Sequence, residues 1–285
     1  MKSHPTHQRF LQNTSLAVLV FVSPLLLNVS SSADKPPTTK SRSGANDKSG
    51  DIEAALQAAR IEFEKDDDGK IIEVIFSSAD KCPISVNNLR LVGKITTLTS
   101  VGSRLSDDHI STEELAALAN IKTIDSLKFD LCQFKGTDLK KLMGLPKLTT
   151  IDWTDCQIDD DAMRGIGMLK TLTVLKLRGN QITDTGVRFL SKMKTLEELN
   201  LDKTKDDVFI IKAPPITDES LITLKPMKQL RSLSLKRNAI TDAGLKHLAD
   251  YKSLKELDLA NTQVTDAAIA KLQMALPECK INTKD

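Results

Sequence analysis

Apolar residues recur along this chain with a fixed period. Leu172, Leu175 and Leu177 follow the spacing Leu-x-x-Leu-x-Leu, and the same spacing begins again at Leu196. The frame opens at Ile124, Leu148, Leu172, Leu196, Leu230 and Leu254. Four of the five steps are 24 residues, and the step from Leu196 to Leu230 is 34. A fixed period in this range predicts a stack of similar coils.

Each coil contains two kinds of spacing. Its first part alternates apolar and polar residues, which predicts a short strand with one buried face. The first buried strand positions are Leu127, Ile151, Leu175, Leu199, Leu233 and Leu257, and the second are Phe129, Trp153, Leu177, Leu201, Leu235 and Leu259. Later in the coil, Ile182, Val187, Leu190 and Met193 have the spacing of a turn and a short helix. We therefore predict an α/β solenoid with a curved parallel sheet on the concave side and short helices on the convex side, its core shared between neighbouring coils.

Helix starts are also marked. Thr-Asp pairs begin at Thr183, Thr217, Thr241 and Thr265, Asp159-Asp160 stands in the same place one coil earlier, and Ser111 with Glu114 fits a capping box. A hydroxyl or carboxylate at this position accepts hydrogen bonds from free N–H groups at the helix start. The alternative is a ladder of acidic metal sites, but capping explains every Thr and Asp without a metal.

One interior position resembles a known family. Eight residues after each coil start stand Cys132, Cys156, Asn180, Thr204, Asn238 and Thr262. In a parallel stack these side chains form a buried ladder that bonds backbone groups of the turns. Together with the Ile-Thr-Asp-x-Gly runs at Ile182 and Ile240, this ladder resembles the cysteine-containing subtype of leucine-rich repeats over about residues 71–281.

The resemblance implies a fold more than an activity. This repeat subtype is known from substrate receptors of F-box ubiquitin ligases and from exported bacterial leucine-rich-repeat proteins of unknown role. A signal-like segment and a polar linker take the place that an F-box would occupy. A ubiquitin-ligase adaptor is therefore a rival hypothesis that rests on repeat similarity alone.

Residues 1–33 have the features of a secretory signal. Lys2 and Arg9 supply positive charge, Leu16–Leu27 is an apolar run, and Ser31-Ser32-Ala33 is a small-residue cleavage site. The run is short for a membrane span, which needs about 20 residues. We expect cleavage near Ala33, export to the periplasm, envelope or exterior, and no membrane span in the mature chain. An uncleaved anchor is the alternative.

The next segments form a linker and a cap. Residues 34–50 are polar and predict a disordered linker. Residues 51–123 predict an N-terminal cap and a degenerate repeat: a helix over Asp51–Ala59, then a hairpin whose Asp-Gly turn at Asp68-Gly69 precedes Ile71–Phe76. The aspartates at this turn lack the ligand pattern of a calcium loop. Apolar residues of 77–110 lie out of register, and 124–285 hold the regular repeats, an insertion at 205–215 and a C-terminal cap closed by Pro277.

Charge argues against nucleic acid as a partner. The chain has 40 basic and 38 acidic residues, and loss of Lys2 and Arg9 with the signal leaves 38 of each. A nucleic-acid binder needs a basic face.

Enzyme and metal chemistry find little support. His109 precedes a helix cap and His247 lies on a predicted convex helix, and neither accompanies a nucleophile motif. Trp153 occupies a core strand position, so we interpret it as packing rather than ligand stacking. Cys132 and Cys156 are neighbours in the ladder, where buried free thiols are favoured over a disulfide. We predict no cofactor and no metal.

Two surfaces are candidates for binding a protein partner. The outward strand positions form one row of Lys128, Asp152, Lys176, Asn200, Ser234 and Asp258, and a second row of Asp130, Thr154, Arg178, Asp202, Lys236 and Ala260. From these we single out Lys128, Asp152, Lys176, Arg178, Asn200, Asp202, Lys236 and Asp258. Charges of opposite sign alternate, which indicates either a salt ladder that satisfies itself or a mixed-charge recognition surface.

The second surface is the insertion, where Val208, Phe209, Ile210 and Ile211 are consecutive apolar residues. They either pack on the solenoid edge or present a patch to a partner. The sequence as a whole predicts an exported, non-enzymatic scaffold that binds protein. The rivals are the ubiquitin-ligase adaptor and a hydrolase with an unrecognised site.

Overall fold

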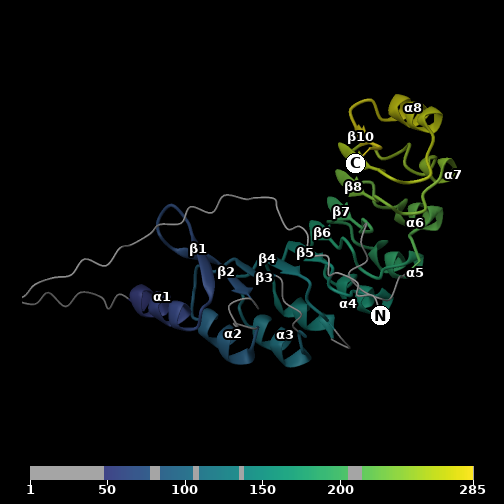
Figure 1. Ribbon diagram of the computed structural model, residues 1–285. Coiled ribbons are helices and arrows are strands. Elements are labelled where there is room, and N and C mark those ends of the chain that lie inside the picture. The colour runs from purple at the N-terminus through teal and green to yellow at the C-terminus, as the bar shows by residue number, and fades with distance from the viewer. Residues whose placement is uncertain (1–47, 78–83, 105–108, 135–137, 205–213, 285) are drawn as a thin grey trace, which may run out of the picture. The chain divides into compact units, whose positions relative to one another are not determined.

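The structure is a computed structural model that describes residues 48–77, 84–104, 109–134, 138–204 and 214–284, all within the unit Asn46–Asp285. Ten strands form one sheet in sequence order (Figure 1). They are β1 (Glu62–Lys65), β2 (Ile71–Ser77), β3 (Ser100–Arg104), β4 (Ser126–Asp130), β5 (Thr150–Thr154), β6 (Val174–Lys176), β7 (Glu198–Asn200), β8 (Ser232–Ser234), β9 (Glu256–Asp258) and β10 (Lys280–Asn282). All neighbours are parallel except β1 and β2.

Short helices connect the strands on the other side of the sheet (Figure 1). The α-helices are α1 (Lys48–Ala58), α2 (Val86–Val92), α3 (Thr112–Leu118), α4 (Asp160–Ile166), α5 (Asp184–Val187), α6 (Asp218–Leu224), α7 (Asp242–Leu245) and α8 (Asp266–Ala275). The 3₁₀ helices are η1 (Leu139–Gly144) and η2 (Arg188–Leu190). This is the predicted α/β leucine-rich-repeat solenoid, with strands on one side and short helices on the other.

The predicted register is confirmed. Leu175 pairs with Ile151 on one side and with Leu199 on the other, and Leu199 pairs in turn with Leu233. These four side chains are at most 1% exposed. The buried column runs through Val74, Val101, Leu127, Ile151, Leu175, Leu199, Leu233 and Leu257, and it ends at the partly buried Ile281. Successive coils therefore share one interior, because the apolar face of a single coil is too small to form a core by itself.

The second buried strand position holds the aromatic part of the core. Trp153 is fully buried, and its ring stacks on Phe134 with centroids 4.3 Å apart. Phe129 lies against both rings. The interpretation of Trp153 as a packing residue is confirmed.

The predicted ladder bonds the turns of neighbouring coils. Oδ1 of the buried Asn180 accepts hydrogen bonds from the backbone N–H groups of Cys156 (3.0 Å) and Ile158 (2.9 Å), and its Nδ2 donates to Trp153 O (2.7 Å). Asn238 makes the same bonds to Ile216 and Leu201. The Cys156 thiol donates to the carbonyl of Thr154 at 3.2 Å. Buried backbone groups of the turns thus find partners in side chains.

Cys132, Cys156 and Cys279 are free thiols, so the predicted pair of free thiols in the ladder is confirmed and the disulfide alternative is wrong. Burial raises the pKa of Cys156 well above its ordinary value, because the thiolate loses solvation there. Cys82 lies outside the described residues.

The helix caps are confirmed, and they do more than the sequence indicated. The hydroxyl of Thr241 accepts from Ala243 N–H at the start of α7 and also donates to Asp218 Oδ2, at 2.6 Å, in the preceding coil. Thr241 N–H donates to Asp218 Oδ1. The same two bonds join Thr183 to Asp160, Thr217 to Asp184 and Thr265 to Asp242. Each aspartate of these pairs therefore clamps the next coil to its own.

The N-terminal cap has the predicted helix and hairpin, although α1 begins three residues earlier than expected, at Lys48. The hairpin joins β1 to β2, and Asp66 Oδ1 accepts from the N–H groups of Asp68 and Lys70 across the turn. Those bonds agree with a turn as the role of this aspartate.

The expectation that the apolar residues of 77–110 lie out of register is wrong for Val101 of β3. Val101 pairs with both Val74 and Leu127 and is fully buried. The sequence predicted a degenerate repeat in this region but not its register, because its step to the next coil is 26 residues rather than 24 and Ser103 stands opposite Phe129 where an apolar residue was expected.

At the other end, α8 ends at Ala275, before Pro277, and β10 is the predicted last strand. Within the described residues, no helix combines the length and apolar character needed to cross a bilayer. The expected signal segment 1–33, the linker up to residue 47, and Val208–Ile211 lie outside the described residues.

Candidate interaction surface

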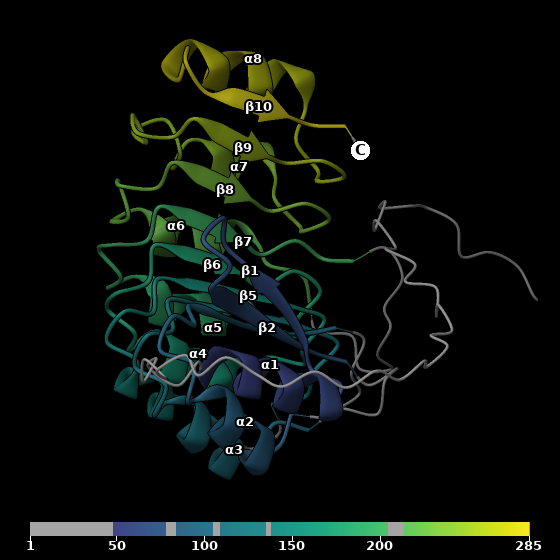
Figure 2. The ribbon, with the colours of Figure 1, turned by 90° about the vertical axis from the view of Figure 1, so that its left-hand side faces the viewer.

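The outward face of the sheet brings the candidate residues together. In the strand register, Lys128 stands opposite Asp152 and Asp152 stands opposite Lys176. Beyond them Asn200, Ser234 and Asp258 continue the row to Asn282 of β10. Figure 2 shows the strands stacked in this order with α5, α6 and α7 behind them. The strand register therefore aligns the residues of the first predicted row across the sheet.

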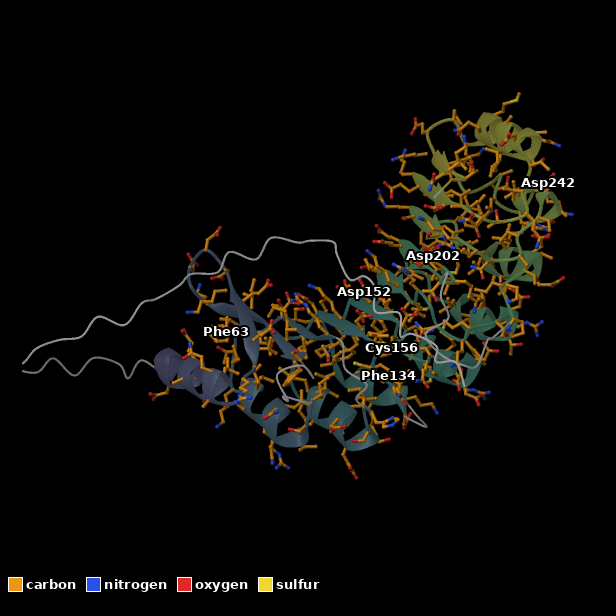
Figure 3. All side chains as sticks on the ribbon, in the orientation of Figure 1. Phe63, Phe134, Asp152, Cys156, Asp202 and Asp242 are labelled. Atoms are coloured by element: carbon orange, nitrogen blue, oxygen red, sulfur yellow. The ribbon has the colours of Figure 1, made fainter. Side chains whose placement is uncertain are left out.

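The two faces carry different side chains. Asp152 and Asp202 lie on the strand side, whereas Asp242, which clamps two coils, lies on the helix side (Figure 3). Most of the first row is partly exposed, with Lys128 the most open, and in the second row Arg178 is exposed whereas Asp202 and Ala260 are buried.

The ion pairs differ from the predicted ladder between neighbouring strands. Lys236 and Asp258 form such a pair at 3.1 Å. Lys128 instead reaches two strands back to Glu73 of β2 at 3.1 Å. Lys176 pairs with Glu198 of the neighbouring strand β7 at 2.9 Å rather than with Asp152 of its own row. The alternating ladder is therefore wrong for Lys128, Asp152 and Lys176.

The part of this face over β7–β10 is saturated with internal hydrogen bonds. Asp202, only 7% exposed, accepts from Ser234 Oγ at 2.6 Å, from Lys236 N–H at 2.8 Å and from Asn200 Nδ2 at 3.2 Å. Asp258 accepts from Asn282 Nδ2 at 2.9 Å as well as from Lys236. These polar groups hold one another in fixed positions.

The part over β4–β6 is less satisfied. Burial raises the pKa of Asp152, although Lys176 and Lys128 oppose that shift and the Thr154 side chain hydrogen-bonds the carboxylate. Burial likewise raises the pKa of Asp130, against the attraction of Arg178. Among the described residues, neither carboxylate has an ion-pair partner within 4.0 Å. Both carboxylates have therefore lost solvation without gaining a close cation.

The sheet face is hollowed at two places. One hollow, of about 660 Å³, lies over β7–β10, and its lining includes Asn200, Asp202 and Lys236. The other, of about 640 Å³, lies over β2–β6, and its lining includes Glu73, Ile75, Gly102, Lys128, Asp152 and Arg178. Both are lined by side chains of both signs.

Sequence reasoning missed Glu73, Gly102 and Glu198 as members of this surface. Glu73 and Gly102 belong to coils whose spacing departs from 24, so the frame did not reach them. Allowing coils of 26 and 27 residues would have aligned Ile75 and Gly102 with Lys128. Glu198 stands two residues before Asn200, on the same strand face, and could have been read from the alternation.

Other candidate chemistry is scattered. His247 is partly exposed on the helix side, in the turn after α7 rather than on the predicted helix, and His109 is exposed and bridges to Gln133. Over the residues that the structure describes, no group of three or more His, Cys, Asp or Glu side chains could hold a metal ion.

Comparisons with known proteins agree with this architecture. A sequence model of the family described as Leucine Rich repeat matches residues 169–191, 228–249 and 252–272. No curated protein matches the chain.

Three solved structures are similar to this chain at low sequence identity. An internalin (inlF) from Listeria monocytogenes is 20% identical, with a TM-score of 0.50 over 67% of this chain and 49% of that one. This chain thus spans about half of that internalin's length. An internalin C2 from the same species is 20% identical, with a TM-score of 0.47 over 81% of this chain and 91% of that one. A TLR13–ssRNA13 complex is 16% identical, with a TM-score of 0.44 over 69% and 30%. The family model thus identifies leucine-rich repeats at residues 169–191, 228–249 and 252–272, and the chain has the leucine-rich-repeat solenoid fold.

Proposed function

We propose that this chain is an exported scaffold without catalytic activity that binds a protein partner through the outward face of its sheet. The observation that carries the proposal is the row from Lys128 to Asp258, which crosses six parallel strands. Nothing in the fold of a solenoid requires a charged row at these positions, because the core is built from the opposite face.

The chemistry of the face suits a protein partner. Exposed ion pairs such as Lys176–Glu198 contribute about 0–1 kcal/mol each, so a partner can exchange them at little cost. Charges of both signs alternate over a few ångströms, which favours a polypeptide with its own mixed charges over a uniformly anionic nucleic acid. The proposed contacts are Lys128, Asp152, Lys176, Arg178, Asn200, Asp202, Lys236 and Asp258.

Photo-crosslinking tests which face is used. Benzoylphenylalanine is placed in the full chain at Thr154 or Ser234 on the sheet face, and at Lys246, an exposed residue of the helix side, as the matched control. Each variant is irradiated in the native cell-envelope fraction. We expect a discrete crosslinked species of one mass from Thr154 or Ser234 and none from Lys246. Crosslinks confined to Lys246 would overturn the proposal.

Export is tested separately. The signal-like segment 1–33 supports it, and intact mass of the native protein should give a chain that begins at Asp34. A native chain that retains residues 1–33 would favour the anchor instead. Cleavage would also exclude the adaptor of a cytosolic ubiquitin-ligase complex.

The insertion is proposed as a second contact, on sequence grounds alone. Replacement of Val208–Ile211 by Gly and Ser should leave the melting temperature nearly unchanged and weaken capture of the crosslinked partner. A large fall in melting temperature would assign these four residues to the core.

A further inference from the structure

The lack of a side chain at Gly102 leaves room for the Lys128 side chain to extend away from Asp152, its neighbour on the next strand. Gly102 stands between Ile75 and Lys128 in the first row, and a Cβ there would lie 3.0 Å from Lys128 O. With no side chain at this point, the Lys128 ammonium extends over β3 to Glu73, whose Oε1 also accepts from Ser100 Oγ at 2.8 Å. Lys128 is thereby held away from Asp152.

Lys176 is drawn away on the other side. Its ammonium lies 2.9 Å from Glu198, which stands two residues before the row partner Asn200 on the neighbouring strand. Asp152 therefore sits between two lysines that are each paired with a different carboxylate.

The hollow over β2–β6 consequently has an excess of negative charge. Its lining includes four carboxylates (Glu64, Glu73, Asp130 and Asp152) against Arg104, Lys128 and Arg178. Lys128 neutralises Glu73 within the lining, and Arg104 lies 3.9 Å from Glu62 outside it. Arg178 is then left opposite three carboxylates, Glu64, Asp130 and Asp152. Ile75, only 4% exposed, and Gly102 add small apolar surface to the same hollow. The hollow therefore offers room for a side chain next to carboxylates that lack a close cation.

The hollow over β7–β10 has no such deficit. Lys236 pairs with Asp258, and Asp202 accepts three hydrogen bonds from described neighbours. A partner charge there would have to break bonds that already exist, at a cost that offsets the new contact.

From this contrast we infer that the protein partner inserts an arginine or lysine side chain into the hollow over β2–β6, where Asp152 and Asp130 receive its charge and Ile75 and Gly102 contact its aliphatic stem. The inference rests on the proposed function and names the chemistry of the partner segment. Arginine suits the site better than lysine, because its fork can bond carboxylates from two strands at once.

A random dodecapeptide library displayed on phage and selected on the immobilised full chain tests the inference. We expect the selected peptides to carry Arg or Lys at a fixed position, enriched over the unselected library. Synthetic copies should bind Asp130→Asn/Asp152→Asn at least about tenfold more weakly than the parent, because a partly buried charge pair loses one member. Glu256→Gln, in the lining of the hollow over β7–β10 and outside the proposed contacts, should change binding of these peptides less than about twofold.

A double-mutant cycle separates a direct charge pair from a general loss of binding. Substitution of the peptide's basic residue by Gln should weaken binding to the parent about tenfold and should have little further effect on Asp152→Asn. Asparagine has nearly the same shape as aspartate, so Asp130→Asn/Asp152→Asn and Asp152→Asn should fold like the parent, and an unchanged melting temperature verifies this.

Three outcomes would overturn the inference: no selected peptides, selected peptides without a basic residue, or additive losses in the cycle. In each of these cases the sheet-face crosslinks from Thr154 or Ser234 could still form, so the proposed function would stand alone. Crosslinks confined to Lys246 would remove both proposals.

Discussion

Single residues set how closely the coils approach one another. Gly167 ends α4 with helical backbone angles, φ −61° and ψ −9°, that any residue adopts. The reason for glycine is the next coil: a Cβ at Gly167 would lie 2.4 Å from the backbone oxygen of Phe189. Backbone cannot yield as a flexible side chain can, so this contact fixes the distance between two coils.

We predict that Gly167→Ala lowers the free energy of unfolding by about 1–3 kcal/mol, because the coils must separate to admit the methyl group. Gly50→Ala is the matched control, since a Cβ at Gly50 in α1 has nothing within 4 Å. It should be neutral or stabilising by up to about 1 kcal/mol from helix propensity. Equilibrium urea unfolding measures both, and equal effects would refute a steric role for Gly167.

At the scale of the element, the Thr-Asp pair has two functions. The threonine caps its own helix, and the aspartate one residue later holds the next coil's threonine. The capping role could be predicted because it is local, and Thr183, Thr217, Thr241 and Thr265 all perform it. The clamp could not, because it depends on how far one coil is displaced from the next, which no local pattern records.

Asp218→Ala should lower stability by about 1–2 kcal/mol more than Asp266→Ala. Both substitutions remove an acid from the first turn of a helix, which contributes about 0.3–1 kcal/mol in either case. Only Asp218 also accepts from Thr241 N and Oγ1, whereas Asp266 begins the last described helix and has no described coil beyond it. Urea unfolding of the two variants measures the difference, and equal losses would mean that the clamp adds nothing.

Asp184 gives the clamp a dependence on pH. Burial alone would raise its pKa, but hydrogen bonds from Ser220 and Thr217 outweigh burial and lower it below the ordinary value of 3.8. A lowered pKa in the folded state adds stability that is fully present well above pH 3.8 and is lost as pH falls through the folded pKa. We therefore expect Asp184→Asn to reduce the slope of stability against pH below about pH 4.

The hydroxyl that donates to Asp184 provides a second variant for the same measurement. Ser220 is fully buried and its Oγ lies 2.5 Å from Asp184 Oδ1. Ser220→Ala should shift the acid limb of the stability profile in the same direction, by a smaller amount, because Thr217 still donates. Identical acid limbs in the parent and both variants would contradict the assignment.

For the candidate surface, the sequence predicted which residues share a row but not which charges form ion pairs. Alternation within a strand placed Lys128, Asp152 and Lys176 in one row, and the register confirms it. Which charges pair was not predictable, because Lys128 reaches Glu73 across Gly102 in coils whose spacing hid them. The ion-pair partner of a long flexible side chain depends on how the coils are arranged in space, and the repeat period along the sequence does not describe that arrangement.

At the scale of the whole molecule, each coil is supported by the coils beside it. The hairpin of β1 and β2 together with α1 covers the first coil, whereas β10 and α8 have a described neighbour on one side only. Ile281, Val264 and Ile269 are accordingly only partly buried there. In a stack whose stability is a sum over interfaces, we expect this coil, with its partly buried core residues, to open more often than the described central coils.

The three described thiols can report this gradient. All three thiols are buried, so a reagent reaches them only after local opening. Burial also raises the pKa of Cys156 and Cys279, which lowers their thiolate fraction. In a Cys82→Ser background, a pulse of N-ethylmaleimide followed by mass spectrometry should modify Cys279 at least about tenfold faster than Cys132 and Cys156, which lie in central coils. Cys279 is 3% exposed and the other two thiols are fully buried, so static exposure could also contribute to the difference in alkylation rate. The Asp218→Ala variant separates the two causes. A larger difference in rate in that variant would assign the reaction of Cys279 to opening of the C-terminal coils. Equal rates at all three thiols would mean that the solenoid opens as one cooperative unit.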